Sequence, residues 1–169
     1  MRRIRRQYSH RVAQRDQQLV ERIASLDVPP APADSPPMLP RDVTELSYQD
    51  LMILFGEMTG WAAHYAGLLA QAEAREESAE SLLEFRRAQA KEAIANRGGK
   101  KSATEVKAAA EADEDVQSAK EEYLKARAER RMAQVRYDNS CRFAAFLSRE
   151  LSRRTATRDQ DGRAEKWLP

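Results

Sequence analysis

The side chains that could support catalysis or metal binding are few and scattered along this chain. The sequence has two histidines, His10 and His64, and a single cysteine, Cys141. They form no Cys/His cluster with zinc-ligand spacing. Residues 98–102 contain two glycines and two lysines, but they lack the first glycine and the preceding strand of a phosphate-binding loop. We therefore expect a protein that is not an enzyme and that uses no cofactor and no metal.

A run of acids offers the one candidate for cation binding. It consists of Glu111, Asp113, Glu114 and Asp115. Carboxylates at this density can chelate a hard cation. The alternative is a solvated helix face, and we favour this second interpretation because nothing else in the sequence indicates a metal.

Positive side chains cluster around the two glycines, and they suggest a different chemistry. The cluster consists of Arg86, Arg87, Lys91, Arg97, Lys100 and Lys101. Glycines let a backbone approach phosphates closely, and the first turn of a following helix points free N–H groups outward. We predict contacts to nucleic-acid phosphates that do not read the base sequence. The alternative is a charged loop that serves only solubility.

A second basic series lies further along the chain, at Lys125, Arg127, Arg130, Arg131, Arg136 and Arg142. Acidic side chains precede it at Glu73, Glu76, Glu77 and Glu80. We expect the two series to form ion pairs, either within one subunit or between neighbouring subunits.

These residues must be positioned by two long helices, one from Tyr48 to Asn96 and one from Ala103 to Arg154. Ser47 and Asp50 predict the N-cap of the first helix, and Ser102-x-x-Glu105 is a capping box for the second. No proline lies between Pro40 and Pro169. Each helix would be about 75 Å long. The short glycine-containing connection near 97–102 favours antiparallel packing. The predicted fold is all-α, a long coiled-coil-like antiparallel helical hairpin at 47–154.

Other segments flank the predicted hairpin. Residues 1–26 read as a basic amphipathic helix, with Ile4, Tyr8, Val12, Leu19, Ile23 and Leu26 at helical spacing. This arm could dock on the protein itself, contact nucleic acid, or lie on a membrane surface. Residues 27–46 form a Pro-rich linker. Residues 155–169 read as a polar tail, whose Trp167 we expect to pack back on the hairpin base.

The base of the predicted hairpin has more apolar surface than two helices can hide. The residues concerned are Leu51, Ile53, Leu54, Phe55, Phe143, Phe146 and Leu147. Surplus apolar surface at one end indicates an association site. We therefore predict a homo-oligomer that assembles through these residues.

Charge is unevenly distributed, although the net charge is only +2. Residues 1–27 carry a net charge of +4, residues 28–124 carry −8, and residues 125–169 carry +6. Such asymmetry indicates head-to-tail ionic association or an anionic partner. With one cysteine, no apolar run after the basic N-terminus and no transmembrane stretch, we expect a cytoplasmic protein that does not bind membranes.

Several of these features together resemble a known family. Glu105-Val106-Lys107 followed by Ala112-Asp113-x-Asp115-Val116 is similar to the start of the second helix in UvsY-type phage recombination mediators. Trp61 in the first helix, the glycine loop and the later Cys141-Arg142-Phe143 segment add to the resemblance, which covers roughly residues 47–150. The family's basic motif is not reproduced, and Arg86, Arg87 and Lys91 are only nearby substitutes.

The resemblance implies a homo-oligomer of helical hairpins that binds single-stranded DNA. Such a mediator helps a RecA-like recombinase to displace single-strand-binding protein and to load onto the strand. The competing hypothesis from the sequence is a structural or scaffolding coiled-coil protein, for example of a phage, with no role at nucleic acid. Binding to single-stranded DNA at physiological salt distinguishes the two hypotheses, because only the mediator is expected to bind.

Overall fold

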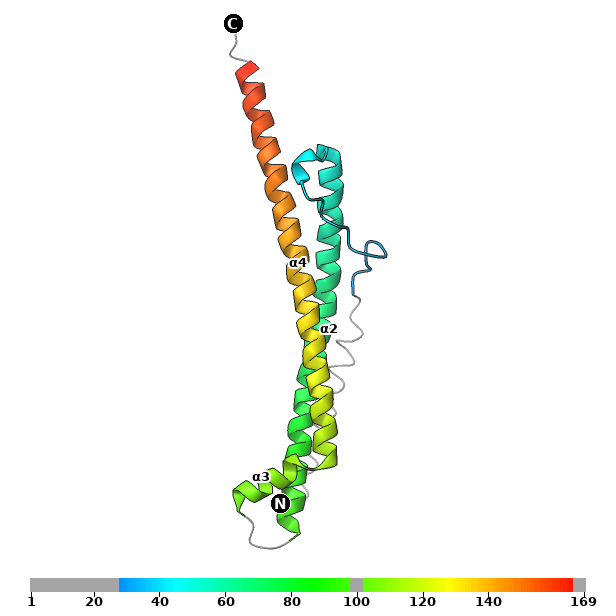
Figure 1. Ribbon diagram of the computed structural model, residues 1–169, viewed down its shortest axis with the longest axis vertical. Coiled ribbons are helices and arrows are strands. Elements are labelled where there is room, and N and C mark those ends of the chain that lie inside the picture. Colours follow the sequence, from blue (N-terminus) through cyan, green and yellow to red (C-terminus); the bar gives the residue numbers. More distant parts are fainter. Residues whose placement is uncertain (1–27, 98–101, 166–169) are drawn as a thin grey trace. The chain divides into compact units, whose positions relative to one another are not determined.

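The computed structural model describes residues 28–97 and 102–165, and of residues 159–165 only the backbone. Its elements are the short 3-10 helix η1 (Val43–Glu45) and the helices α2 (Tyr48–Asn96), α3 (Ala103–Glu111) and α4 (Glu114–Glu165) (Figure 1). The described residues contain no strand, so the predicted all-α class and the helical hairpin are confirmed. The predicted arm, both loop glycines, Lys100, Lys101 and Trp167 lie outside the described residues.

Helix α2 begins and ends where the sequence predicts. The Ser47 hydroxyl accepts a hydrogen bond from the backbone N–H of Asp50 at 3.1 Å and donates to the Asp50 carboxylate at 2.6 Å. Leu46, just before this cap, packs against the core cluster that contains Leu51. The cap and the apolar contact therefore fix the first turn together, as a hydrophobic staple does.

The second predicted helix is in fact two helices, and this corrects the prediction of one continuous helix from Ala103. The capping box at Ser102 and Glu105 starts α3 as predicted. The helix ends at Glu111, because Asp113 acts as a new N-cap: its carboxylate accepts from the N–H of Asp115 at 3.1 Å. The acids Glu114 and Asp115 then occupy the first turn of α4, where negative charge stabilises a helix.

The far end of α4 also differs from the prediction. We expected the helix to end near Arg154, where the apolar pattern stops, but it continues to Glu165. The residues beyond Arg154 include alanine, arginine, glutamine and glutamate, which favour a helix, and they contain no proline before Pro169. The apolar pattern therefore stops near Arg154, but the helix itself continues.

The chain divides into two compact units, and each unit has its own core. Unit 1 includes Leu68–Ala133, and unit 2 consists of Val28–Gly67 with Gln134–Pro169. The core of unit 1 is small and rich in alanine, and it consists of Leu83, Ala90, Ala110, Val116 and Ala119. The core of unit 2 has larger side chains, at Val43, Leu51, Met58, Leu147 and Leu151.

The residues before α2 form a strap along the surface of that helix. A Cβ atom built at Gly60 would lie 2.8 Å from Pro32, and one at Gly67 would lie 2.9 Å from Val28. The two glycines therefore allow the strap to approach the helix closely. Between them, the Nδ1 of His64 lies 2.7 Å from the carbonyl oxygen of Pro29, to which it donates a hydrogen bond. His64 thus ties the strap to α2 and has a structural role.

Arg154, on α4, binds the end of the strap that lies next to the start of α2. Its guanidinium donates to the carbonyl oxygens of Leu46 at 2.7 Å, Val43 at 2.9 Å and Thr44 at 3.1 Å. Glu150, which is only 9% exposed, accepts hydrogen bonds from Arg154 and from Arg153 at 2.8 Å or less. These two guanidinium groups lower the pKa of the Glu150 carboxyl from its usual 4.5 to about 2.

The core of unit 2 leads to a first prediction. Leu147 is fully buried, whereas Val135 on the same helix is 57% exposed. We expect Leu147→Ala to lower the free energy of unfolding by about 3 kcal/mol, because it removes buried methyl groups and leaves a cavity. The control Val135→Ala should change it by less than about 0.5 kcal/mol. Urea unfolding followed by circular dichroism measures both, and equal effects would contradict the assignment of the core.

The environment of Glu150 leads to a prediction about pH. Because the pKa of Glu150 is lower in the folded protein than in the unfolded chain, its contribution to stability is present above pH 4.5 and is lost as the pH falls toward 2. Thermal unfolding of the wild type should therefore show a falling midpoint over this range. In Glu150→Gln the midpoint should be lower at neutral pH and should fall less steeply. Parallel pH curves for the two proteins would show that the carboxylate is not held by the arginines.

Candidate nucleic-acid interface

The basic cluster predicted near the loop is only partly available for phosphates. Arg87 Nε lies 2.8 Å from Glu111 Oε1, although its N–H is not aligned for a hydrogen bond, and Arg87 Nη2 donates to Glu111 Oε2 at 3.2 Å. This contact lowers the pKa of the Glu111 carboxyl. Arg86 Nη1 lies 3.4 Å from Asp115 Oδ2. Two of the acids that looked like a cation site are therefore partners of these two arginines.

Two further members of the cluster remain exposed. Neither Lys91 nor Arg97 forms an ion pair with any residue that the structure describes. Lys100 and Lys101 lie outside the described residues. Of the six residues predicted from the sequence, the structure thus places two in ion pairs and leaves two exposed near the end of α2.

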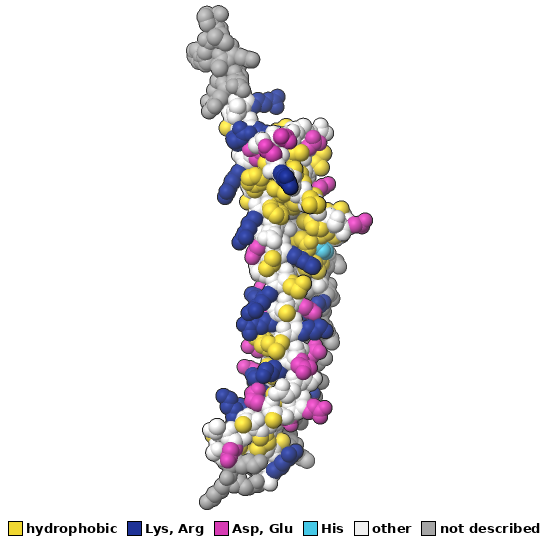
Figure 2. Space-filling model, viewed as in Figure 1, with side chains coloured by type: hydrophobic (Ala, Val, Ile, Leu, Met, Phe, Trp, Pro, Cys, Tyr) yellow, Lys and Arg dark blue, Asp and Glu magenta, His cyan; other side chains and the backbone are white. Residues whose placement is uncertain are grey.

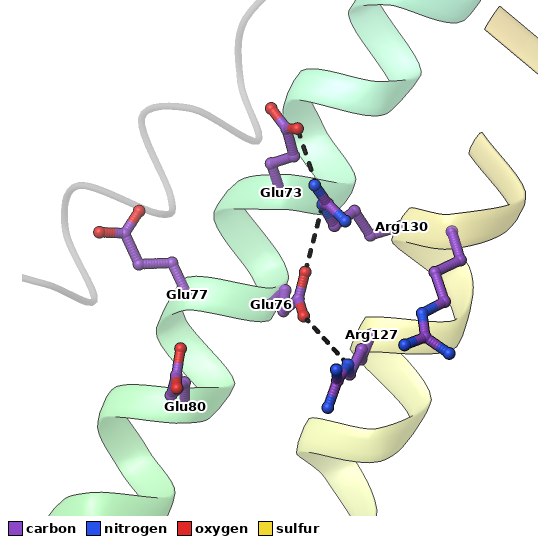
Figure 3. Close-up of a pocket in the computed structure, with 7 residues that line it drawn as sticks. Glu73, Glu76, Glu77, Glu80, Arg127 and Arg130 are labelled. Atoms are coloured by element: carbon purple, nitrogen blue, oxygen red, sulfur yellow. Dashed lines mark ion pairs between the residues drawn. The ribbon is translucent and has the colours of Figure 1, made fainter. Parts of the chain in front are cut away.

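The predicted ion pairing between the two helices is confirmed for Arg127 and Arg130, whereas the other four bases of that series form no ion pair with the described residues. Arg130 Nε lies 3.3 Å from Glu76 and 3.7 Å from Glu73, and Arg127 Nε lies 3.9 Å from Glu76 (Figure 3). These residues line an open groove of about 450 Å³, together with Glu77, Glu80 and Arg131. With four acids and three bases, the groove has nearly balanced charge, so it is a poor site for a polyanion. Exposed pairs of this kind contribute about 0–1 kcal/mol each.

A heptad pattern determines which side of α4 faces α2. Positions at alternating steps of three and four run without interruption from Val116 to Arg154, and every one of them is at least partly buried. They are Val116, Ala119, Tyr123, Ala126, Arg130, Ala133, Tyr137, Ser140, Ala144, Leu147, Leu151 and Arg154. This is the seam of a coiled coil. The residues about half a turn away from it form the outer face of α4.

In unit 2 this outer face combines arginine with large apolar side chains. We define the outer stripe as Val135, Asn139, Arg142, Phe146 and Arg149, which follow one another at steps of four and three. Phe146 is 46% exposed, and its neighbour Phe143 is 42% exposed. Arg142 and Arg149 are exposed and form no ion pair within the described part of the chain.

The balance of charge around the stripe is strongly positive. Between Gln134 and Arg158, α4 carries six arginines and two acids, and one of the acids, Glu150, is already paired with Arg153 and Arg154. Figure 2 shows Lys and Arg side chains beside hydrophobic ones over this part of the helix. Sequence reasoning assigned Arg136 and Arg142 to ion pairs with α2 and did not single out Arg149. The spacing from Phe146 to the two arginines, one step before and one step after it, is the signal that would have found the stripe.

The residues predicted to drive oligomerisation fall into two groups. Leu51 and Leu147 are fully buried in the chain's own core, and Leu54 and Phe55 are half-buried against it. Ile53, at 54% exposure, lies on the surface near the start of α2, as do Met52 and Tyr48. Phe143 and Phe146 belong to the exposed side of α4. Surface available for association therefore exists at both places in unit 2.

Other kinds of site find no support in the described residues. No group of three or more His, Cys, Asp or Glu side chains in the described ranges is placed to hold a metal ion. None of the helices, in the part searched, combines the length and apolar character that crossing a bilayer requires.

Comparisons with known proteins add no family to these observations. The chain matches no protein-family model, no curated protein and no solved structure.

Proposed function

We propose that this chain is a non-enzymatic protein that binds single-stranded DNA along the outer stripe of α4. The observation that supports the proposal best is the exposure of Phe143 and Phe146 between Arg142 and Arg149, whose exposed guanidinium groups form no ion pair with the described residues. Proteins that bind single strands without sequence preference combine aromatic side chains, on which bases stack, with positive groups that contact the backbone. The stripe offers both on one helical face.

Within this proposal the protein acts as a recombination mediator, as its resemblance to UvsY-type proteins implies. It assists a RecA-like recombinase in replacing single-strand-binding protein on the DNA. A homo-oligomer presents several stripes at once, so weak contacts add up to useful avidity while each of them remains reversible. Reversibility matters, because the recombinase must finally displace the mediator.

The second candidate function is a structural or scaffolding coiled-coil protein without a role at nucleic acid. Two observations favour it: the charges of α2 and α4 balance each other in the groove of unit 1, and residues 28–124 carry a net charge of −8. For a scaffold, the exposed apolar side chains of α4 contact protein and not bases.

Fluorescence anisotropy of a labelled single-stranded oligonucleotide tests the first candidate. We expect binding that weakens steeply between about 50 and 200 mM salt. Arg142→Ala/Arg149→Ala should weaken binding and lower the salt slope by about two, because two phosphate contacts are lost. Phe146→Ala should weaken binding about tenfold with an unchanged salt slope, because it removes stacking and no charge.

The matched control is Lys91→Ala/Arg97→Ala, which removes the same charge from exposed positions at the end of α2. This variant should bind nearly as well as the wild type. Loss of binding in the control alone would move the interface to the end of the hairpin. Absence of binding by the wild type at about 50 mM salt would reject the mediator and leave the scaffold.

The proposed oligomer has a separate test in sedimentation velocity. Met52→Ser/Ile53→Ser should reduce the sedimenting mass toward that of the monomer, because it makes the exposed apolar start of α2 polar. Met38→Ser, at a residue that is 92% exposed in the strap, is the control and should leave the mass unchanged. An unchanged mass in the double variant would place the contact elsewhere, and a monomeric wild type would reject the oligomer.

A further inference from the structure

The strap lies along α2 in a defined direction. Pro32 lies against Gly60, Pro29 accepts from His64, and Val28 lies against Gly67. From Gly60 to Gly67 the residue numbers of α2 rise, while those of the strap residues beside them fall. The strap and α2 therefore run antiparallel. The described chain therefore begins, at Val28, beside Gly67, and α2 extends from that point to Asn96.

The surface of α2 continues this line beyond Gly67. The positions that follow at helical steps are Gln71, Ala74, Ser78, Leu82 and Phe85. Ala74 is buried, although it lies two residues from the seam position Ala72 and therefore about 200° around the helix from it. Leu82 is 46% exposed, and Phe85 is half-buried. This side of α2 thus has a line of positions away from the seam with α4, and we call it the apolar line because Ala74, Leu82 and Phe85 stand in it.

Acidic side chains border the apolar line on one flank. Glu73, Glu77, Glu80 and Glu84 follow one another at steps of four, three and four, roughly one residue before the positions of the line. Only Glu73 reaches an arginine of α4 among the described residues. Figure 3 shows Glu77 pointing away from α4. Glu77, Glu80 and Glu84 form no ion pair with the residues that the structure describes.

The arm has the complementary pattern in its sequence. Its apolar positions include Val12 and Ile23, and arginines stand one residue before them, at Arg11 and Arg22. Arg11, Arg15, Gln18 and Arg22 follow one another at steps of four, three and four, as the four acids do. Three of these four positions are arginines. In an antiparallel pair of right-handed helices, a residue just before the contact line lies on the same side in both. The arginines and the acids would therefore meet.

We propose that residues 1–26 form a third helix that binds antiparallel along residues 71–85 of α2. If Val28 opposite Gly67 sets the register, Arg22 lies opposite Glu73, Arg15 opposite Glu80 and Arg11 opposite Glu84. Leu19, Ile23 and Val12 then cover the apolar line. In this proposal the arginines of the arm pair with acids of the same chain. The proposal therefore does not depend on DNA binding.

Disulfide trapping in the full chain tests the position of the arm. In a Cys141→Ser background, Val12→Cys/Leu82→Cys should form an intramolecular disulfide about tenfold faster than Val12→Cys/Ala95→Cys. The control cysteine sits about 20 Å further along the same helix. Equal rates would overturn the docking. A disulfide that joins two chains would overturn it in favour of an arm that binds a second copy.

A charge exchange tests the pairing itself. Arg11→Glu/Arg15→Glu should lower the thermal midpoint by about 2–4 °C, because like charges face each other across the contact. Adding Glu80→Arg/Glu84→Arg should restore the midpoint if the register is right. Failure of the second pair of changes to restore stability would overturn the proposed register. Neither experiment contains nucleic acid, so their failure is distinct from failure of the proposed function.

Discussion

Two helices packed side by side can bury only one stripe of each, and this constraint governs the whole protein. The seam between α2 and α4 uses that stripe. The other described segments either cover the apolar surface that lies outside the seam or leave that surface exposed. The strap covers the surface around Gly60 and Gly67, and α3 brings Ala110 into the core of unit 1. Arg154 supplies hydrogen bonds to three carbonyls of the strap.

The distribution of charge follows from the same constraint. Where the seam is weak, in unit 1, arginines of α4 reach across it to glutamates of α2 and the charges balance. In unit 2 the seam is mostly apolar, and the described residues there form no ion pair between α2 and α4. The arginines of the outer stripe are exposed there, next to the exposed side chains of Phe143 and Phe146. The proposed contact to single-stranded DNA rests on this combination of positive charge and aromatic surface.

Local signals in the sequence predicted the fold well, but they did not predict one helix break and several contacts between distant residues. The bounds of α2 follow from Ser47, Asp50 and the loop glycines, all within one turn of the helix ends. The break at Asp113 was missed, because an aspartate before two further acids also fits a helix interior. The pairing of Arg87 with Glu111 depends on α3 turning back, and the role of Arg154 depends on carbonyls more than a hundred residues away. Neither contact has a signature in the local sequence.

The two cores differ in the size of their side chains, and this difference has a consequence for motion. Alanine buries far less apolar surface than leucine or methionine, so the core of unit 1 gains less free energy on folding than the core of unit 2. Opening events should therefore begin in α3 and the adjoining ends of α2 and α4, where amide hydrogens exchange with solvent soonest. The end with Leu51 and Leu147 stays closed during such events. One end of the chain can then open and close again while the other end keeps its fold.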